Sequence, residues 1–103
     1  MIDVGILSAE DAIAWGITGP ALRATGVPYD VRRAFPYSGY EQYEFDVVTR
    51  TEGDAYARFM VRLDEMDQSM RIIEQVRKQL DTPGPVMIAD TKFAPPPKET
   101  IAL

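Results

Sequence analysis

Residues 54–80 read DAYARFMVRLDEMDQSMRIIEQVRKQL, and this stretch decides the fold of the chain. Its apolar residues recur every three or four positions, which is the period of a helix that turns one face toward other protein. Asp54 is a favourable N-cap residue, and the run Pro83-Gly84-Pro85 just beyond Leu80 stops a helix. The sequence therefore predicts one long amphipathic helix over residues 54–80. Its apolar positions are Tyr56, Phe59, Met60, Leu63, Met66, Met70, Ile73, Val76 and Leu80.

The predicted helix is long for a chain of 103 residues. At about 1.5 Å per residue it extends about 40 Å, whereas a compact domain of about 100 residues is roughly 34 Å across. Its apolar face is also broad, because Val61 and Ile72 lie beside the main stripe. Met1 leads directly into sequence that is typical of a strand already begun. We therefore expect the chain to be a segment of a longer protein, and the isolated chain to self-associate through the helix.

Two stretches before the helix alternate apolar and polar residues, which is the pattern of a strand with one buried face. Between them, Ser8 offers an N-cap for a short helix that runs from Ala9 to about Trp15 and ends at Gly16. We therefore predict an α+β fold: short strands in a small sheet, one short helix and one long helix. The predicted strands are Ile2–Leu7 and Tyr43–Thr49. We expect residues 1–103 to form a single unit with three parts. Residues 1–53 hold a strand, the short helix, an aromatic loop and the second strand. The long helix follows at 54–80 and an extended Pro-rich tail at 81–103.

The composition excludes several classes of function. The chain has no cysteine and no histidine, so it offers no disulfide, thiolate metal site, thiol nucleophile or Ser-His-Asp triad. Eleven basic and sixteen acidic residues give a net charge of −5 without any basic stripe, which argues against nucleic acid and anionic lipid as partners. No stretch approaches the roughly 18 apolar residues that a membrane-spanning helix needs, so we expect no direct membrane insertion.

Three motifs invite a functional interpretation, and each has a simpler one. The glycines between Gly16 and Gly26 lack the lysine and the spacing of a phosphate-binding loop, so we interpret them as turn residues. The aromatic loop at 27–43 lies among arginines and could stack on bases, but the net negative charge favours a packed loop. Methionines on the long helix could line a peptide or cofactor groove, but methionine more often fills gaps in a core. These methionines are Met60, Met66 and Met70.

Adjacent acidic residues could form the carboxylate pair of a small hydrolase. The candidate pairs are Glu10 with Asp11 and Asp64 with Glu65. Neighbouring residues on a helix point in different directions, so neither pair is suited to shared acid–base work. We therefore assign no catalytic residue, no cofactor-binding residue and no metal ligand to this chain.

Several runs of residues together match the pattern of one known family. The most specific is DVRRAFPYSGY at Asp30–Tyr40, whereas a helix pattern alone would not be specific. Other runs are WGITGP at 15–20, LRATGV at 22–27, YEFDV at 43–47, GDAY at 53–56 and RIIEQ at 71–75. On these residues, in one collinear order over essentially the whole chain, the sequence resembles the D subunit of bacterial NADH-quinone oxidoreductase, respiratory complex I.

The resemblance implies a central segment of a fold related to the large subunit of nickel–iron hydrogenases. It also implies a peripheral position at the cytoplasmic face of the bacterial plasma membrane, close to the terminal iron–sulfur cluster and the quinone cavity of complex I. The family's quinone-binding histidine and tyrosine lie N-terminal to this segment, and the nickel ligands of the hydrogenase relatives lie near the ends of the longer chain. We therefore expect no cofactor bound by this chain, although the parent complex uses quinone and NAD.

Two functions stay open on the sequence. The first is a scaffold within the D subunit that supports the quinone-reduction site, with the rest of that polypeptide and other peripheral-arm subunits as partners and no activity in isolation. The second is a free-standing interaction module that binds a protein through its helix and Pro-rich tail. In the segment itself we expect partly buried ion pairs to hold the loop against the long helix, with Tyr37 and Tyr40 packed between them. The expected pairs join Arg23, Arg32, Arg33, Arg58 and Arg62 to Asp30, Asp46, Asp54 and Glu65.

Overall fold

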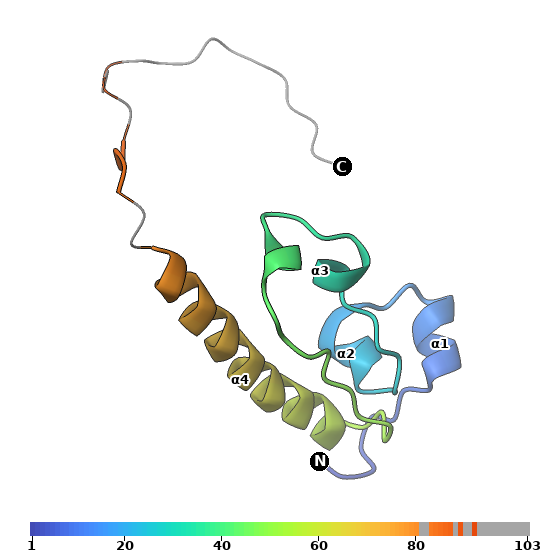
Figure 1. The fold of residues 1–103 in the computed structure, drawn as a ribbon. Helices are drawn as coiled ribbons and strands as arrows, with labels where there is room; N and C mark the ends of the chain where they lie inside the picture. Colours follow the sequence, from blue (N-terminus) through green and yellow to red (C-terminus); the bar gives the residue numbers. More distant parts are fainter. Residues whose placement is uncertain (81–82, 88, 90–91, 93–103) are drawn as a thin grey trace.

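The computed structural model describes residues 1–80, 83–87, 89 and 92. Its elements in chain order are α1 (Ala9–Ala14), α2 (Gly19–Arg23), α3 (Val31–Ala34), the 3-10 helix η1 (Tyr40–Gln42) and α4 (Ala55–Gln79) (Figure 1). None of the described residues forms a strand, so the predicted small sheet is wrong and this part of the chain is helical. Within the same part, no helix combines the length and the apolarity that a membrane crossing requires. The proline run at 95–97 of the predicted tail lies outside the described residues.

The long helix α4 confirms the strongest prediction from the sequence. It runs from Ala55 to Gln79, so its ends agree with the prediction to within one residue. Asp54 is the N-cap: its Oδ1 accepts a hydrogen bond from the N–H of Ala57 at 2.7 Å, and its Oδ2 accepts one from the N–H of Asp3 at 2.8 Å. These hydrogen bonds lower the pKa of Asp54. An ionised carboxylate at the positive end of the helix dipole therefore fixes where α4 begins.

The first residues of the chain do not form the predicted strand Ile2–Leu7. They turn around the start of α4 instead, and Asp3 has a φ of 57°, which a strand does not accommodate. The turn brings the carbonyl of Val4 to the N–H of Ala55, which donates to it at 2.9 Å. The first N–H groups of a helix have no partner within the helix, so this segment stabilises α4 by supplying an acceptor.

The prediction of a second strand at Tyr43–Thr49 is also wrong. The segment runs alongside α4 in the opposite direction, and side-chain amides of the helix take the place of a neighbouring strand (Figure 1). Gln75 accepts from the N–H of Glu44 at 2.8 Å and donates to the carbonyl of Glu44 at 2.7 Å. Gln68 accepts from the N–H of Asp46 at 2.9 Å. The alternation of the sequence thus reflects a segment with one side against a helix.

The short helices follow local capping signals. The hydroxyl of Ser8 accepts from the N–H of Asp11 at 3.0 Å, and Gly16, with a φ of 64°, lies just beyond the end of α1, as predicted. Helix α3 lies in the loop that was predicted to be irregular. Its N-cap is Asp30, whose carboxylate accepts from the N–H of Arg32 at 2.9 Å. The capping signal for α3 was therefore present in the sequence, although a helix of four residues leaves no periodic pattern.

The core of the described residues is small. Ala24, Ala57 and Val61 are buried together, and Val48 packs against them. The small side chains of the two alanines allow the C-terminal end of α2 to lie close to the N-terminal half of α4 (Figure 1). Most large apolar side chains of α4 lie outside this core and are exposed. The residues that the structure describes therefore cover only one side of α4.

Candidate functional site

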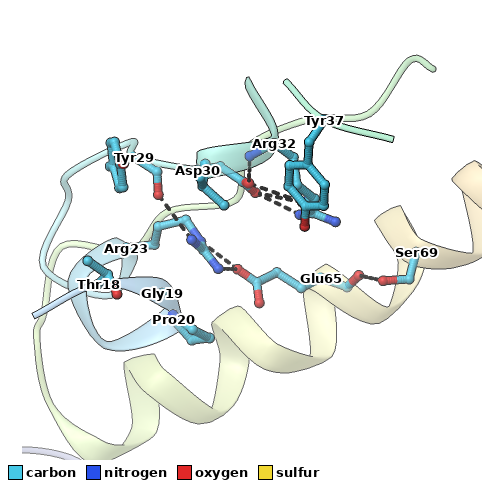
Figure 2. A pocket seen from close by; sticks show the side chains of 11 residues that line it. Thr18, Gly19, Pro20, Arg23, Tyr29, Asp30, Arg32, Tyr37, Glu65 and Ser69 are labelled. Carbon is cyan, nitrogen blue, oxygen red and sulfur yellow. Dashed lines mark hydrogen bonds and ion pairs between the residues drawn. The ribbon is translucent and has the colours of Figure 1, made fainter. Parts of the chain in front are cut away.

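A cavity of about 620 Å³ lies between α2, the loop that leads into α3 and the middle of α4 (Figure 2). Its charged wall residues are Arg23 from α2, Asp30 and Arg32 from the loop and α3, and Glu65 from α4. Figure 2 shows these four side chains in two pairs, and in each pair the guanidinium of an arginine points toward a carboxylate. Part of the wall belongs to the stretch Asp30–Tyr40, the most specific run of the sequence. This cavity is therefore the best candidate for a functional site.

Arg23 joins α2 and the loop to α4. Its Nε donates to Oε1 of Glu65 at 2.6 Å, and its Nη2 lies 2.6 Å from the same oxygen. Its Nη1 donates to the carbonyl of Tyr29 at 3.0 Å. The side chains of Arg23 and Glu65 are only 9% and 19% exposed, so both charges have lost most of their water. A pair of this kind fixes geometry more than it adds stability, because desolvation offsets the Coulomb attraction.

Asp30 and Arg32 form the second pair, within the loop itself. Arg32 donates from Nη2 to Oδ2 at 2.7 Å and from Nε to Oδ1 at 3.0 Å, which is the two-pronged geometry of a strong arginine–carboxylate pair. The hydrogen bonds from Arg32, together with the positive charges of Arg32 and Arg23, lower the pKa of Asp30, although burial acts in the opposite direction. The same pairing raises the pKa of Arg32. Both groups therefore stay charged near neutral pH.

Phe45 links the loop to the segment that runs along α4. The guanidinium carbons of Arg32 and Arg33 lie 4.6 and 4.0 Å from the centre of its ring, and the residue is buried. Arg33 also donates from Nη2 to the carbonyl of Phe45 at 2.6 Å. Tyr40 meets the same ring edge-on, with 6.3 Å between the ring centres. Cation–π contacts thus allow two adjacent arginines to pack beside an aromatic side chain.

The arrangement has the chemistry of a structural joint. The two guanidinium groups in the cavity wall are each paired with a carboxylate, so the wall offers no unpaired charge to an ionic ligand. The hydroxyl of Ser69, also in the wall, donates to the carbonyl of Glu65 on its own helix at 2.9 Å, so it is not aligned with a general base. Among the residues that the structure describes, no cluster of three acidic side chains is placed to hold a metal ion.

We expect the acid side of the stability curve to depend on Asp30. Because its pKa is lower in the folded chain than its ordinary value of 3.8, the unfolded state binds more protons in this pH range. The stabilisation by Asp30 is complete above that ordinary value and is lost as the pH falls through the lower, folded pKa. The midpoint of urea unfolding should therefore fall less between about pH 5 and about pH 2 in an Asp30→Asn variant than in the parent chain. An Asp67→Asn variant is the control, because Asp67 is exposed. Equal pH dependence of unfolding in the parent chain and the Asp30→Asn variant would contradict the expectation.

The structure confirms part of the predicted set of ion pairs. Arg23 with Glu65 and Arg32 with Asp30 form as expected. The remaining members of the set bind other groups: Arg33 the Phe45 carbonyl, Arg58 the carbonyls of Gly5 and Gly53, Arg62 the carbonyl of Arg58, Asp46 the side chain of Arg71, and Asp54 the N–H groups of Asp3 and Ala57. Tyr37 and Tyr40 contact each other edge-on, with 5.1 Å between the ring centres.

Among the described residues, three pairs were missed in the sequence. Two of them join Arg71 of α4 to Glu44 and Asp46, at 3.8 and 3.1 Å. Arg50, at the end of the segment beside α4, pairs with Asp64 of α4. The two residues lie in different elements, so no helical spacing relates them. The adjacent carboxylates of Asp64 and Glu65 thus contact different arginines, Arg50 and Arg23, as expected for neighbouring residues on a helix.

Comparisons with known proteins agree on one family. The family model described as the 49 kDa subunit of respiratory-chain NADH dehydrogenase matches residues 1–103. The chain is 54% identical over 101 residues to the D subunit of NADH-quinone oxidoreductase from Frankia alni, covering 98% of this chain and 21% of that protein. It is 49% identical over 98 residues to the D subunit from Rhodospirillum centenum, covering 94% of this chain and 25% of that protein. The chain thus spans about a fifth to a quarter of the length of these curated relatives.

Proposed function

Because the chain belongs to the family of the 49 kDa subunit of respiratory-chain NADH dehydrogenase, we propose that it is a segment of the D subunit of NADH-quinone oxidoreductase. In this role it is a scaffold that supports the quinone-reduction site and the transfer of electrons from NADH to quinone. The observation that carries the scaffold role is the internal pairing of all four charged wall residues of the cavity, Arg23 with Glu65 and Asp30 with Arg32. These side chains hold α2, the loop and α4 together and leave no charged group for a reaction. Family membership favours this function over the free-standing interaction module.

The proposed role also implies binding partners for this chain. The rest of the D subunit and other peripheral-arm subunits of the complex would contact this segment, at a peripheral position on the cytoplasmic face of the bacterial plasma membrane. NAD and quinone would be bound by other parts of the complex, and the isolated chain would have no NADH-oxidising activity. Names of the relatives support the assignment to this complex, and the lack of histidine and cysteine in the chain agrees with a segment away from the reacting groups.

A segment replacement tests the proposed function. In Rhodospirillum centenum, the part of the D subunit that aligns with this chain would be exchanged for residues 1–103, with deletion of the part as the negative control. We expect the chimeric subunit to assemble, and membranes to couple NADH oxidation to quinone reduction, because about half of the residues are identical. A chimeric subunit that is absent from the complex, or a complex that assembles without quinone reduction, would contradict the proposal.

We also propose that the isolated chain self-associates through the exposed apolar side of α4. Met66 is 64% exposed there, and burying such side chains between two copies is favourable. Light scattering over about a hundredfold range of concentration should show the mean mass rising with concentration. A Met66→Lys variant should shift the chain toward monomer, while Lys78→Glu, on an exposed position of the same helix, should not. A monomer at every concentration would contradict this expectation.

A further inference from the structure

A tight turn between α3 and η1 brings two tyrosines together (Figure 1). The N–H of Tyr40 donates to the carbonyl of Tyr37 at 3.0 Å, and the two residues between them, Ser38 and Gly39, have φ values of 51° and 82°. This hydrogen bond, with positive φ at both central residues, is the signature of a type I′ turn. Such a turn keeps the Cα atoms of its first and last residues less than about 7 Å apart. The local backbone therefore sets the contact between Tyr37 and Tyr40.

The two phenol rings touch, and they differ in exposure. Their centres lie 5.1 Å apart with 63° between the ring planes, near the short end of the range of about 4.5–7 Å for aromatic pairs. Tyr37 is 51% exposed, so a small solute can reach its ring. Tyr40 is half-buried, with the ring centre of Phe45 at 6.3 Å and the guanidinium carbon of Arg32 at 5.7 Å from its own ring centre. These contacts hold Tyr40 in place beside the exposed ring.

The other tyrosines of the chain are not paired in this way. Tyr43, for example, donates from its hydroxyl to Oε1 of Gln79 at 3.0 Å. The part of the chain that the structure describes includes all five tyrosines, and within it Tyr37 and Tyr40 are the only two phenols in ring contact. Neither phenol takes part in the ion pairs that join α2, the loop and α4. The scaffold role therefore leaves this pair of rings without a function.

Two phenols in contact have a characteristic oxidative chemistry. A one-electron oxidant takes an electron from a phenol, the O–H proton passes to water, and a neutral phenoxyl radical remains. When both phenols have been oxidised, a carbon–carbon bond forms between the ring carbons next to the two C–O groups. Each of these carbons then loses its hydrogen as a proton and each oxygen regains a proton, which restores two phenols. In total the pair loses two electrons and two protons, and two equivalents of the oxidant are each reduced by one electron.

We propose that Tyr37 and Tyr40 are an oxidative modification site, at which small one-electron oxidants join the two rings of one chain as dityrosine. The type I′ turn supplies the proximity, and the exposure of Tyr37 admits the oxidant. The contacts of Tyr40 with Phe45 and Arg32 keep the second ring next to the first. The site depends on the geometry of this turn alone, so it is independent of the proposed function.

Photochemical oxidation of the full chain tests this proposal. The oxidant is tris(bipyridine)ruthenium, illuminated briefly in the presence of persulfate. Trypsin then releases the peptide Ala34–Arg50, which contains Tyr37, Tyr40 and Tyr43. We expect this peptide to lose two hydrogen atoms in mass spectrometry, and its fragmentation to show no backbone break between residues 37 and 40. Because the bond forms within one chain, its yield per chain should stay constant on dilution, whereas crosslinks between copies should decrease.

Variants and unfolding separate the pair from the neighbouring tyrosine. Tyr37→Phe and Tyr40→Phe each keep an aromatic ring in the contact and remove one phenol, so each should lower the yield of this product several-fold. Tyr43→Phe, which removes the third tyrosine of the same tryptic peptide, is the matched control and should leave the yield unchanged. In urea the turn is lost, so the yield of the product that joins Tyr37 to Tyr40 should fall several-fold relative to the folded chain.

Each alternative outcome overturns the proposal. Dityrosine that forms only between copies, or not at all, would show that the two rings are not placed for coupling. A yield that persists in Tyr37→Phe or Tyr40→Phe, or that is lost in Tyr43→Phe, would show that other tyrosines form the bond. Equal yields in buffer and in urea would show that the type I′ turn does not bring the rings together. None of these results bears on the segment replacement, which tests the proposed function separately.

Discussion

Replacing Gly53 with alanine should lower the free energy of unfolding by about 3–5 kcal/mol. Gly53 has a φ of 65°, in the left-handed region that other residues adopt only with strain. A Cβ at this position would also collide with the backbone carbonyl oxygen of Leu7. That carbonyl has little freedom to move, because the N–H of Leu7 donates to the carbonyl of Gly53 at 2.9 Å. The N–H of Gly53 donates in turn to the carbonyl of Ala24 at 2.9 Å, so any shift would disturb the contact of α2 with the start of α4.

A matched control separates the collision from the backbone strain. Gly16 has nearly the same φ, 64°, but a Cβ there meets no heavy atom of the described residues within 4 Å. A Gly16→Ala substitution should therefore cost only about 1–2 kcal/mol, the strain of the left-handed conformation. Urea unfolding, followed by the helical circular dichroism signal, gives both values. Equal losses in the two variants would show that Gly53 and Leu7 do not make the close contact seen in the structure.

The other large effect is expected at Glu65. Removal of its carboxylate in a Glu65→Ala variant leaves the guanidinium of Arg23 buried without a charged partner, which should lower the free energy of unfolding by about 3–5 kcal/mol. Asp46→Ala is the matched control, because the Asp46 side chain is 76% exposed where it pairs with Arg71, and its loss should cost less than about 1 kcal/mol. Similar losses in the two variants would contradict the burial of the Arg23–Glu65 pair.

A double-mutant cycle then measures the pairing itself. The cycle consists of the single variants Arg23→Met and Glu65→Leu and the double variant, which replaces both charges with apolar side chains and should be more stable than Glu65→Leu alone. The carbonyl of Tyr29 loses its donor in this variant, so recovery should be incomplete by about 1 kcal/mol. We expect a coupling energy on the order of 2 kcal/mol between the two positions. Additive effects, with no coupling, would show that Arg23 and Glu65 act independently.

The parts of the fold that the sequence predicts well are those decided by local signals. The ends of α4 follow from the N-cap Asp54 and the prolines beyond Leu80, and α1 follows from Ser8 and Gly16. Each of these signals acts within a few residues, so no knowledge of the remote contacts is needed. The helical period of α4 was also clear enough to predict this helix without knowledge of the segments that pack against it.

Both strand predictions failed because alternation does not reveal which partner satisfies the backbone. Around Glu44 the partner is the amide of Gln75, a side chain of α4, and not another strand. At Val4 the carbonyl binds the first turn of α4, and a left-handed Asp3 breaks any strand geometry. A sequence pattern of period two only states that alternate residues have different surroundings.

The charged residues of the candidate site were predicted as members of a set of ion pairs, but the sequence did not say which member of the set pairs with which. Arg23 and Glu65 lie 42 positions apart, so no spacing rule joins them. Asp30 and Arg32, two positions apart, pair through a local capping contact that the sequence does suggest. The contacts of Arg32 and Arg33 with Phe45 depend on how the loop folds back on α4, which only the three-dimensional structure shows.

In the proposed role, this segment supports the electron-transfer complex without taking part in its chemistry. The most direct test places Glu65→Gln in the full-length D subunit and measures two quantities: the amount of assembled complex, and the rate of quinone reduction by NADH per assembled complex. We predict that the amount of complex falls because the joint between α2 and α4 is weakened, while the rate per assembled complex stays unchanged. A complex that assembles in normal amount but has lost quinone reduction would contradict the scaffold role.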